Sequence, residues 1–186
     1  MFGFFKRLLA QKNAVAEDIA TLLDAEDRKW REMSADDLFA LDDTDLVSAV
    51  ISRVFGSFGS CEDEQDRIAM MNGDQRVIYT VYTYESEVNN GGLCQYLSND
   101  SRFFAPMLCE ALKTIGDTVH YAHFAAFVRD NAIDLSGLDS FGKDAIRRYE
   151  KLEKRYPFEP FDDAFYEMPS LEAPMAAYIR ARIVSF

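Results

Sequence analysis

Apolar positions recur with a helical period along most of the chain. In residues 75–88, Val77, Val81, Tyr84 and Val88 are spaced by three or four residues, as on one face of a helix. The same segment is rich in β-branched and aromatic residues, which favour strands, but its apolar positions do not alternate. We therefore expect a helix here, and an all-α fold for the chain as a whole.

Capping residues and glycines indicate where further helices begin and end. Ser34 precedes one helix start, Thr44 caps a run to about residue 55, Gly116 ends a helix, and Asp117 begins the next. The remaining expected helices cover about 4–23, 26–32, 62–71, 91–98, 103–115, 117–132 and 174–184. This pattern predicts a compact multi-helix domain at 61–186, preceded by a helical extension at 1–60 that is acidic from residue 17.

The region after residue 139 has a strongly charged helix and several breaks. Ser140 is the expected cap of a helix to Arg155, whose polar positions suit a solvated face with pairs such as Glu150 with Lys154. Pro157 and Pro160 predict a turn, and residues 162–168 a second short turn. No apolar run approaches the roughly 20 residues that span a bilayer, so we expect a cytoplasmic protein.

Acidic residues are concentrated in one block of the sequence. Residues 17–66 hold 15 Asp or Glu against 4 Lys or Arg, a net charge of −11, whereas the whole chain carries −12. A surface of this sign repels nucleic acid and anionic membrane and attracts basic proteins, most strongly at low salt. We therefore expect a basic protein as partner, and no direct contact with nucleic acid or membrane.

Nine carboxylates of this block form the candidate contact surface. Side chains three and four residues apart on a helix lie about 5–6 Å from each other, which is compatible with mimicry of phosphates along a nucleic-acid strand. A solvated face that only keeps the protein soluble has the same composition, so both interpretations remain open. The candidate residues are Asp36, Asp37, Asp42, Asp43, Asp45, Glu62, Asp63, Glu64 and Asp66.

The segment from Glu85 to Asn99 combines local order with an unusual set of residues. Asn89-Asn90-Gly91-Gly92 follows the helical run and supplies residues that tolerate positive φ, so the chain is expected to turn there and begin a second short helix. Four further segments accompany this motif downstream: Ala105-Pro106, Glu110 to Gly116, Leu138-Asp139 and Phe161 to Tyr166.

The motif Glu87-Val88-Asn89-Asn90-Gly91-Gly92, with Gln95-Tyr96 after it, resembles a bacterial domain-of-unknown-function family that includes a DNA-mimic protein. The similarity covers roughly residues 65–186. It implies an all-α fold, no enzymatic activity, a homodimer, and, for the mimic, binding to DNA-binding proteins through an acidic face.

The motif residues have a structural and a functional interpretation. A helical wheel places Glu85 on the apolar side, and the N–H groups of Asn90 to Leu93 at the next helix start are available to a carboxylate. In the structural interpretation hydrogen bonds hold two helices at a corner, and in the functional one the same groups bind a ligand. The residues concerned are Glu85, Glu87, Asn89, Asn90, Gly91, Gly92 and Gln95.

His120 and His123 carry the only metal or acid–base signal of the sequence. Their spacing places two imidazoles on neighbouring positions of one helix, and Glu87 could complete a site. His120 also borders an apolar face that includes Phe124, where a core histidine is expected. No zinc-protease motif, phosphate loop or nucleophile motif accompanies the pair, so we expect no metal, no cofactor and no catalytic residue.

These observations predict a non-enzymatic acidic module that binds a basic protein. A DNA mimic that occupies a DNA-binding protein is the specific form that the resemblance implies. An immunity-type protein that binds a toxin is a second hypothesis with the same charge requirement. The enzyme alternative requires a metal or ligand at Glu87, His120 and His123.

Overall fold

The computed structural model describes residues 28–186, and all regular structure within them is helical, which confirms the predicted all-α fold. None of the described helices combines the length and apolar character that a bilayer crossing requires. The helix expected at 4–23 lies outside the described residues. After a helical segment at 28–32, the elements are α2 (Ala35–Phe39), α3 (Asp43–Ser57), α4 (Glu64–Met70), α5 (Gly73–Ser98), η1 (Asp100–Phe104), α6 (Ala105–Thr114), α7 (Thr118–Asp130), η2 (Leu138–Phe141), α8 (Ala145–Arg155), α9 (Phe158–Tyr166), α10 (Glu172–Ala181) and η3 (Ile183–Ser185).

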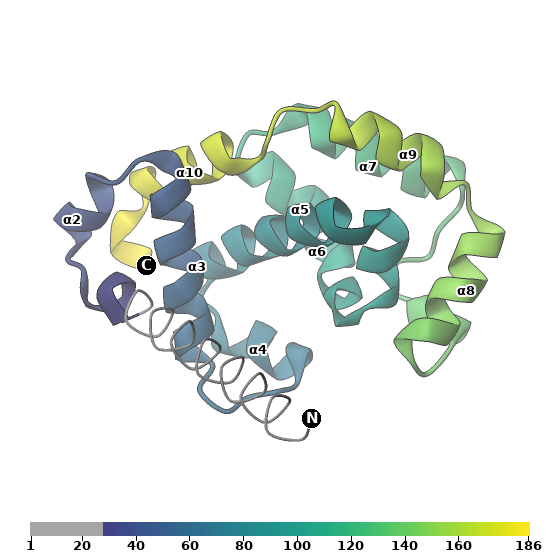
Figure 1. Cartoon of the computed structure of the whole chain (residues 1–186), viewed down its shortest axis with the longest axis horizontal. Helices are drawn as coiled ribbons and strands as arrows, with labels where there is room; N and C mark the ends of the chain where they lie inside the picture. The colour runs from purple at the N-terminus through teal and green to yellow at the C-terminus, as the bar shows by residue number, and fades with distance from the viewer. Residues whose placement is uncertain (1–27) are drawn as a thin grey trace, which may run out of the picture.

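Helix α5, with 26 residues, runs through the middle of the molecule and joins its two ends (Figure 1). Of the predicted apolar positions, Val81, Tyr84 and Val88 are fully buried and Val77 is partly buried, so the helix predicted for residues 75–88 is confirmed. Helices α3 and α10 pack on its first half, and α6, α8 and α9 also pack against it. Because α5 contacts both ends, its shape determines how they are placed.

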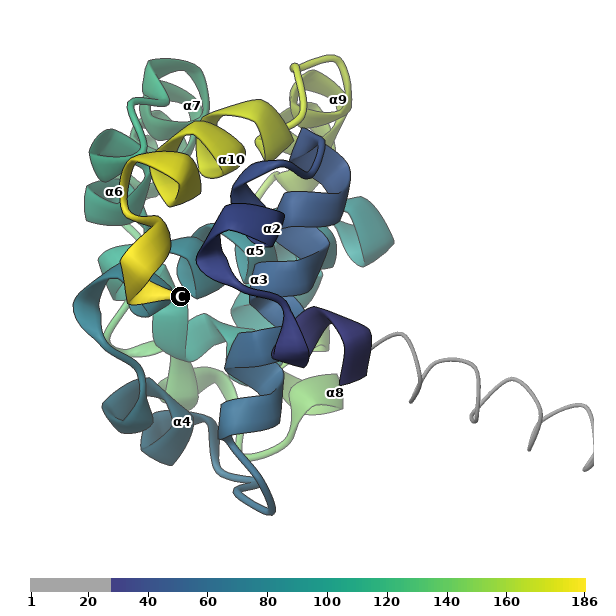
Figure 2. The ribbon, with the colours of Figure 1, turned by 90° about the vertical axis from the view of Figure 1, so that its left-hand side faces the viewer.

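Helices α2, α3 and α10 lie together at one end of α5, as the view along that end shows (Figure 2). The Arg53 guanidinium on α3 donates to the carbonyl oxygens of Trp30, Met33 and Phe186, so it ties both ends of the described chain to α3. Trp30 belongs to the same hydrophobic cluster as Leu93 in the second half of α5. The described helices therefore share one core.

Two helix starts differ from the prediction. Asp42, and not Thr44, caps α3, because its carboxylate accepts the N–H of Asp45 at 2.9 Å. Asp144 caps α8, whereas the expected cap Ser140 lies in η2. Asp, Ser and Thr are all good caps, so packing decides which of several neighbouring candidates begins the helix.

The two turns predicted at Pro157 and Pro160 and at 162–168 are wrong over most of their length, because Phe158–Tyr166 form α9. The chain leaves helical structure only at 156–157, before α9, and turns again at 167–168, after it. Pro160 lies in the first helical turn, where a backbone N–H would have no partner within the helix, so proline is tolerated. Phe161 and Phe165 are buried on the inner face of α9. This helix lies against the middle of α5 and completes the candidate site.

Candidate functional site

Helix α5 bends in the middle of the sequence motif. Gly92 has φ +76° and ψ 175°, a region that residues with a side chain rarely adopt, and the helix resumes at Leu93. A Cβ atom on Gly92 would also lie 2.3 Å from Oδ2 of Asp162 on α9. The predicted break between 75–88 and 91–98 is therefore a kink within α5, and both the backbone conformation and the approach of α9 require glycine.

Two side chains of α9 satisfy the backbone groups that the kink leaves unpaired. The Leu93 N–H, which begins the second half of α5, donates to Oδ1 of Asp162 at 2.8 Å. The Tyr166 hydroxyl donates to the carbonyl of Val88, in the last turn of the first half, at 3.0 Å. Since helix ends leave such groups without intrahelical partners, Asp162 and Tyr166 together cap both sides of the kink.

The Asp162 carboxyl is held in an unfavourable environment for its charge. Burial raises its pKa above the usual range and Asp163 adds to this, while the hydrogen bond from Leu93 and the nearby His123 act in the opposite direction. Glu85, whose predicted partners were the N–H groups of Asn90 to Leu93, instead accepts hydrogen bonds at the start of α10. Asp162 therefore takes the role that the sequence interpretation gave to Glu85.

Glu87 and Gln95 come together across the kink. Oε2 of Glu87 accepts from the Gln95 side-chain amide at 2.8 Å and from that of Asn99 at 3.0 Å. Asn89 and Asn90 are exposed, and their side chains make no hydrogen bond with any of residues 28–186. The corner thus contains two of the predicted polar residues and Asn99, which the sequence interpretation did not single out.

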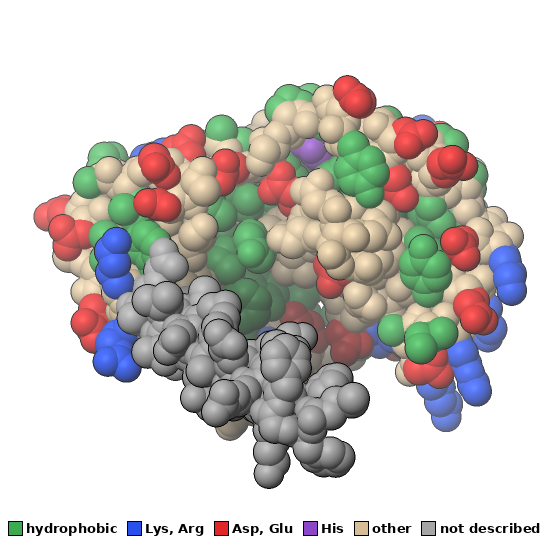
Figure 3. Space-filling model, viewed as in Figure 1, with side chains coloured by type: hydrophobic (Ala, Val, Ile, Leu, Met, Phe, Trp, Pro, Cys, Tyr) green, Lys and Arg blue, Asp and Glu red, His purple; other side chains and the backbone are tan. Residues whose placement is uncertain are grey.

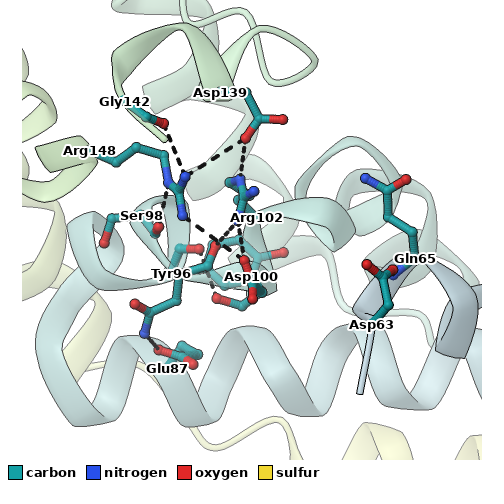
Figure 4. A network of polar contacts seen from close by, with 12 residues as sticks. Asp63, Gln65, Glu87, Tyr96, Ser98, Asp100, Arg102, Asp139, Gly142 and Arg148 are labelled. Atoms are coloured by element: carbon teal, nitrogen blue, oxygen red, sulfur yellow. Dashed lines mark hydrogen bonds and ion pairs between the residues drawn. The ribbon is translucent and has the colours of Figure 1, made fainter. Parts of the chain in front are cut away.

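Two buried arginines next to this corner were also missed. Arg102 and Arg148 expose 8% and 4% of their surface, and their guanidinium groups point toward the same space between Asp100 and Asp139 (Figure 4). Arg102 Nε donates to Asp139 at 2.8 Å, and Arg148 Nε donates to the carbonyl of Ser98 at 2.7 Å. The solvated role predicted for Arg148 is therefore wrong, since it ties α8 to the end of α5.

The two histidines make contacts that hold α7 against α9. Nδ1 of His120 lies 3.1 Å from Oδ1 of Asp117, and its ring meets the edge of Phe165. Nε2 of His123 lies 3.0 Å from the Phe161 carbonyl oxygen, and its ring stacks on that of Phe161. No three His, Cys, Asp or Glu residues within 28–186 are grouped in a way that could hold a metal ion.

The nine predicted contact acids lie in two groups at opposite ends of α3 (Figures 1 and 2). One group lies on α2 and the start of α3, and the other lies around the start of α4. Helix α3 has 15 residues, so at 1.5 Å per residue the groups are about 22 Å apart. The acidic block of the sequence is thus divided in space.

Some of these acids also stabilise the fold. Asp37, Asp42 and Asp63 cap helices, Asp43 pairs with Arg180, and Glu64 pairs with Arg67. Four others are exposed, and their side chains have no hydrogen bond or ion pair with any described residue: Asp36, Asp45, Glu62 and Asp66. Asp36, Asp45 and Asp66 lie in the first turns of α2, α3 and α4, so their contribution to stability is limited to about 0.3–1 kcal/mol each through the helix dipole.

An open cleft of about 660 Å³ lies beside the kink, between α5, α8 and α9. We call it the kink cleft. Burial and the nearby carboxylates of Glu153 and Asp162 raise the pKa of the Cys94 thiol in its wall to about 12, so this thiol is protonated and unreactive at neutral pH. Its lining residues include Gly91, Gly92, Tyr149, Glu153, Glu159, Asp162, Asp163 and Tyr166.

Comparison with known proteins gave one result. A family model described as DMP19-like protein matches residues 69–182, which include the kink, Asp162 and both buried arginines. Searches of curated proteins and of solved structures found no match.

We predict that Gly92→Ala destabilises the protein by about 3 kcal/mol, from backbone strain and from the clash that displaces Asp162. Gly116→Ala is the matched control, because Gly116 has φ +82° but nothing within 4 Å of a Cβ atom. Gly116→Ala should lower the free energy of unfolding only by the backbone strain of the positive φ, about 1–2 kcal/mol. Urea unfolding of both variants measures the difference, and equal losses would show that the approach of Asp162 does not require glycine.

Asp162 should make stability depend on pH. Its pKa is raised in the folded state, so the folded protein holds this proton more tightly, and stability falls as pH rises from about 4 through the folded pKa. Asn at this position keeps an acceptor for the Leu93 N–H but does not ionise. The thermal midpoint of Asp162→Asn relative to that of the wild type should therefore increase from pH 4 to pH 7, and a constant difference would contradict the assignment.

Proposed function

The chain belongs to the DMP19-like protein family, and on this premise we propose that it is a non-enzymatic, acidic DNA mimic that occupies the DNA-binding surface of a basic protein. The proposal includes a cytoplasmic location and a homodimer, with no direct contact with nucleic acid or membrane. It is supported by the family match and by the sign and placement of the exposed charge.

The observation that carries the proposal is the arrangement of the carboxylates at the two ends of α3. Phosphates repeat every 3.4 Å along one DNA strand, so groups about 22 Å apart span about six base-pair steps. DNA-binding proteins position Lys and Arg against phosphates over such distances. Asp36, Asp45, Glu62 and Asp66 are free to make these contacts without loss of a cap or ion pair.

We predict that neutralising these four acids weakens partner binding while the protein still folds, with a loss of about 1–3 kcal/mol from the first-turn acids Asp36, Asp45 and Asp66. The variant carries Asp36→Asn, Asp45→Asn, Glu62→Gln and Asp66→Asn. In a fluorescence assay at about 50 mM salt, wild-type protein should displace labelled duplex from at least one of a panel of bacterial DNA-binding domains. The variant should need about tenfold or more protein for the same displacement, because close charge pairs at interfaces contribute strongly to affinity.

The control removes four acids from other parts of the surface, with Glu110→Gln, Asp130→Asn, Glu167→Gln and Glu172→Gln. It changes the net charge by the same amount. If the position of the acids matters, and not only the net charge, the protein concentration that this control needs to displace DNA should lie within about twofold of the wild-type concentration. The proposal fails if no domain of the panel releases its DNA, or if both variants lose competition equally.

A further inference from the structure

Two further depressions adjoin the kink cleft along α5 and share lining residues. The second lies between α5 and α8 and shares Tyr149 and Glu153 with the kink cleft. The third lies between α4, α5 and η1 and shares Asn99 with the second. We call the three together the motif groove, because the Glu87, Gln95 and Asn99 side chains of the motif corner lie where the second and third depressions meet.

The motif groove is lined by many carboxylates and few cations. Among residues 28–186, Arg67 is the only Lys or Arg of its lining, and it is already paired with Glu64 at 2.9 Å. Apart from Glu64 and Asp100, none of the carboxylates lies within 4.0 Å of a basic side chain of residues 28–186. The acids are Glu62, Glu64, Glu87, Asp100, Glu150, Glu153, Glu159, Asp162 and Asp163.

Helix α8 separates its charges between two faces. Ile146, Tyr149, Glu150 and Glu153 are three or four residues apart and line the groove. Arg148 and Leu152 are buried. The cations Arg147, Lys151, Lys154 and Arg155 are exposed but do not line any of the three depressions, and residues 28–186 contain no Glu150–Lys154 ion pair. The predicted pairing along the helix is therefore wrong, and the acids are left facing the groove.

Aromatic and apolar surface accompanies these acids. Ile146 is 73% exposed, Tyr166 51% and Tyr149 36%. Figure 3 shows acidic and hydrophobic side chains intermixed on the face over α5 and α9, while Lys and Arg side chains project at the end formed by α8. Arginine and lysine suit such a surface, because their charged heads pair with carboxylates and their stems and guanidinium planes pack on tyrosine rings.

We propose that the motif groove binds an extended, arginine- or lysine-bearing segment of a basic protein. Alternate side chains of an extended chain point to the same side about every 6–7 Å, so successive cations can enter successive depressions. This inference rests on the proposed function for the positive charge of the partner. Glu62 and Glu64 belong to both sets of acids, whereas the acids of α8 and α9 belong to the groove alone.

The test uses a labelled ten-residue peptide in which Arg alternates with Ser, and a matched peptide in which citrulline, which is uncharged, replaces Arg. At about 50 mM salt, fluorescence anisotropy should show the Arg peptide binding about tenfold or more tightly than the citrulline peptide. The double variant Glu150→Gln, Glu153→Gln should bind the Arg peptide about fivefold more weakly than the wild type does. The charge-matched control, Glu110→Gln with Glu167→Gln, should change it less than about twofold.

Amide resonances locate the peptide independently of affinity. Those of Gly91, Gly92 and Ile146 should shift when the Arg peptide is added to the wild type, and the same shifts should be smaller in the Glu150→Gln, Glu153→Gln variant. The inference is overturned if both double variants lose affinity equally, if the citrulline peptide binds equally well, or if the shifts are confined to other helices. It is also overturned if sedimentation shows a dimer that excludes the peptide and that the groove variant dissociates.

A third double variant separates this inference from the proposed function. Asp36→Asn with Asp45→Asn alters only the acids of α2 and α3, so it should bind the Arg peptide within about twofold of wild type. If the peptide binds the groove but no DNA-binding domain is displaced from DNA, the proposed function fails and the groove assignment holds. If DNA is displaced but the peptide result is negative, only the groove assignment fails.

Discussion

The hydrogen bond from the Leu93 N–H to the Asp162 carboxylate is the contact on which the arrangement of both halves of α5 depends. A helix that stops and restarts leaves several carbonyl and N–H groups without intrahelical partners, and burying them unpaired would cost free energy. Helix α9 supplies a partner for one N–H and one carbonyl from Asp162 and Tyr166, which are four positions apart on one of its faces. The kink, the placement of α9 and the kink cleft are therefore one structural unit that Gly92 makes possible.

This unit is built at some cost to stability, because a partly buried carboxylate is held next to further acids and has no cationic partner within 4.0 Å in residues 28–186. Cations stabilise the fold elsewhere. Arg53 and Arg180 bind carbonyl groups around α3, Arg102 joins η1 to η2, and Arg148 joins α8 to the end of α5. Arg102 also pairs with Asp100 and Arg180 with Asp43. Apart from Glu64 and Asp100, the carboxylates of the motif groove have no basic side chain within 4.0 Å among residues 28–186.

Features that depend on local spacing could be predicted from the sequence, and features that depend on distant partners could not. The helical face of Val81, Tyr84 and Val88 and the break at the double glycine follow from residue type and period. The role of Asp162 did not, because its partner Leu93 is 69 residues away and proline-based reasoning assigned α9 to a turn. Arg148 lies four residues before the buried Leu152, so its place on the inner face of α8 was detectable from the helical wheel.

The separation of charge on α8 also bears on how a basic partner would approach. At long range the net charge of −12 attracts a cation from every direction, so it cannot by itself select a site. Within a Debye length of about 10 Å at 0.1 M salt, the local arrangement of charged side chains determines where a cation binds. The cationic face of α8 repels the same partner that the groove attracts. A positive segment is therefore directed past the outer face of α8 toward Glu150 and Glu153, where aromatic surface lets it dock. In this way one helix both orients the approach and forms one wall of the groove.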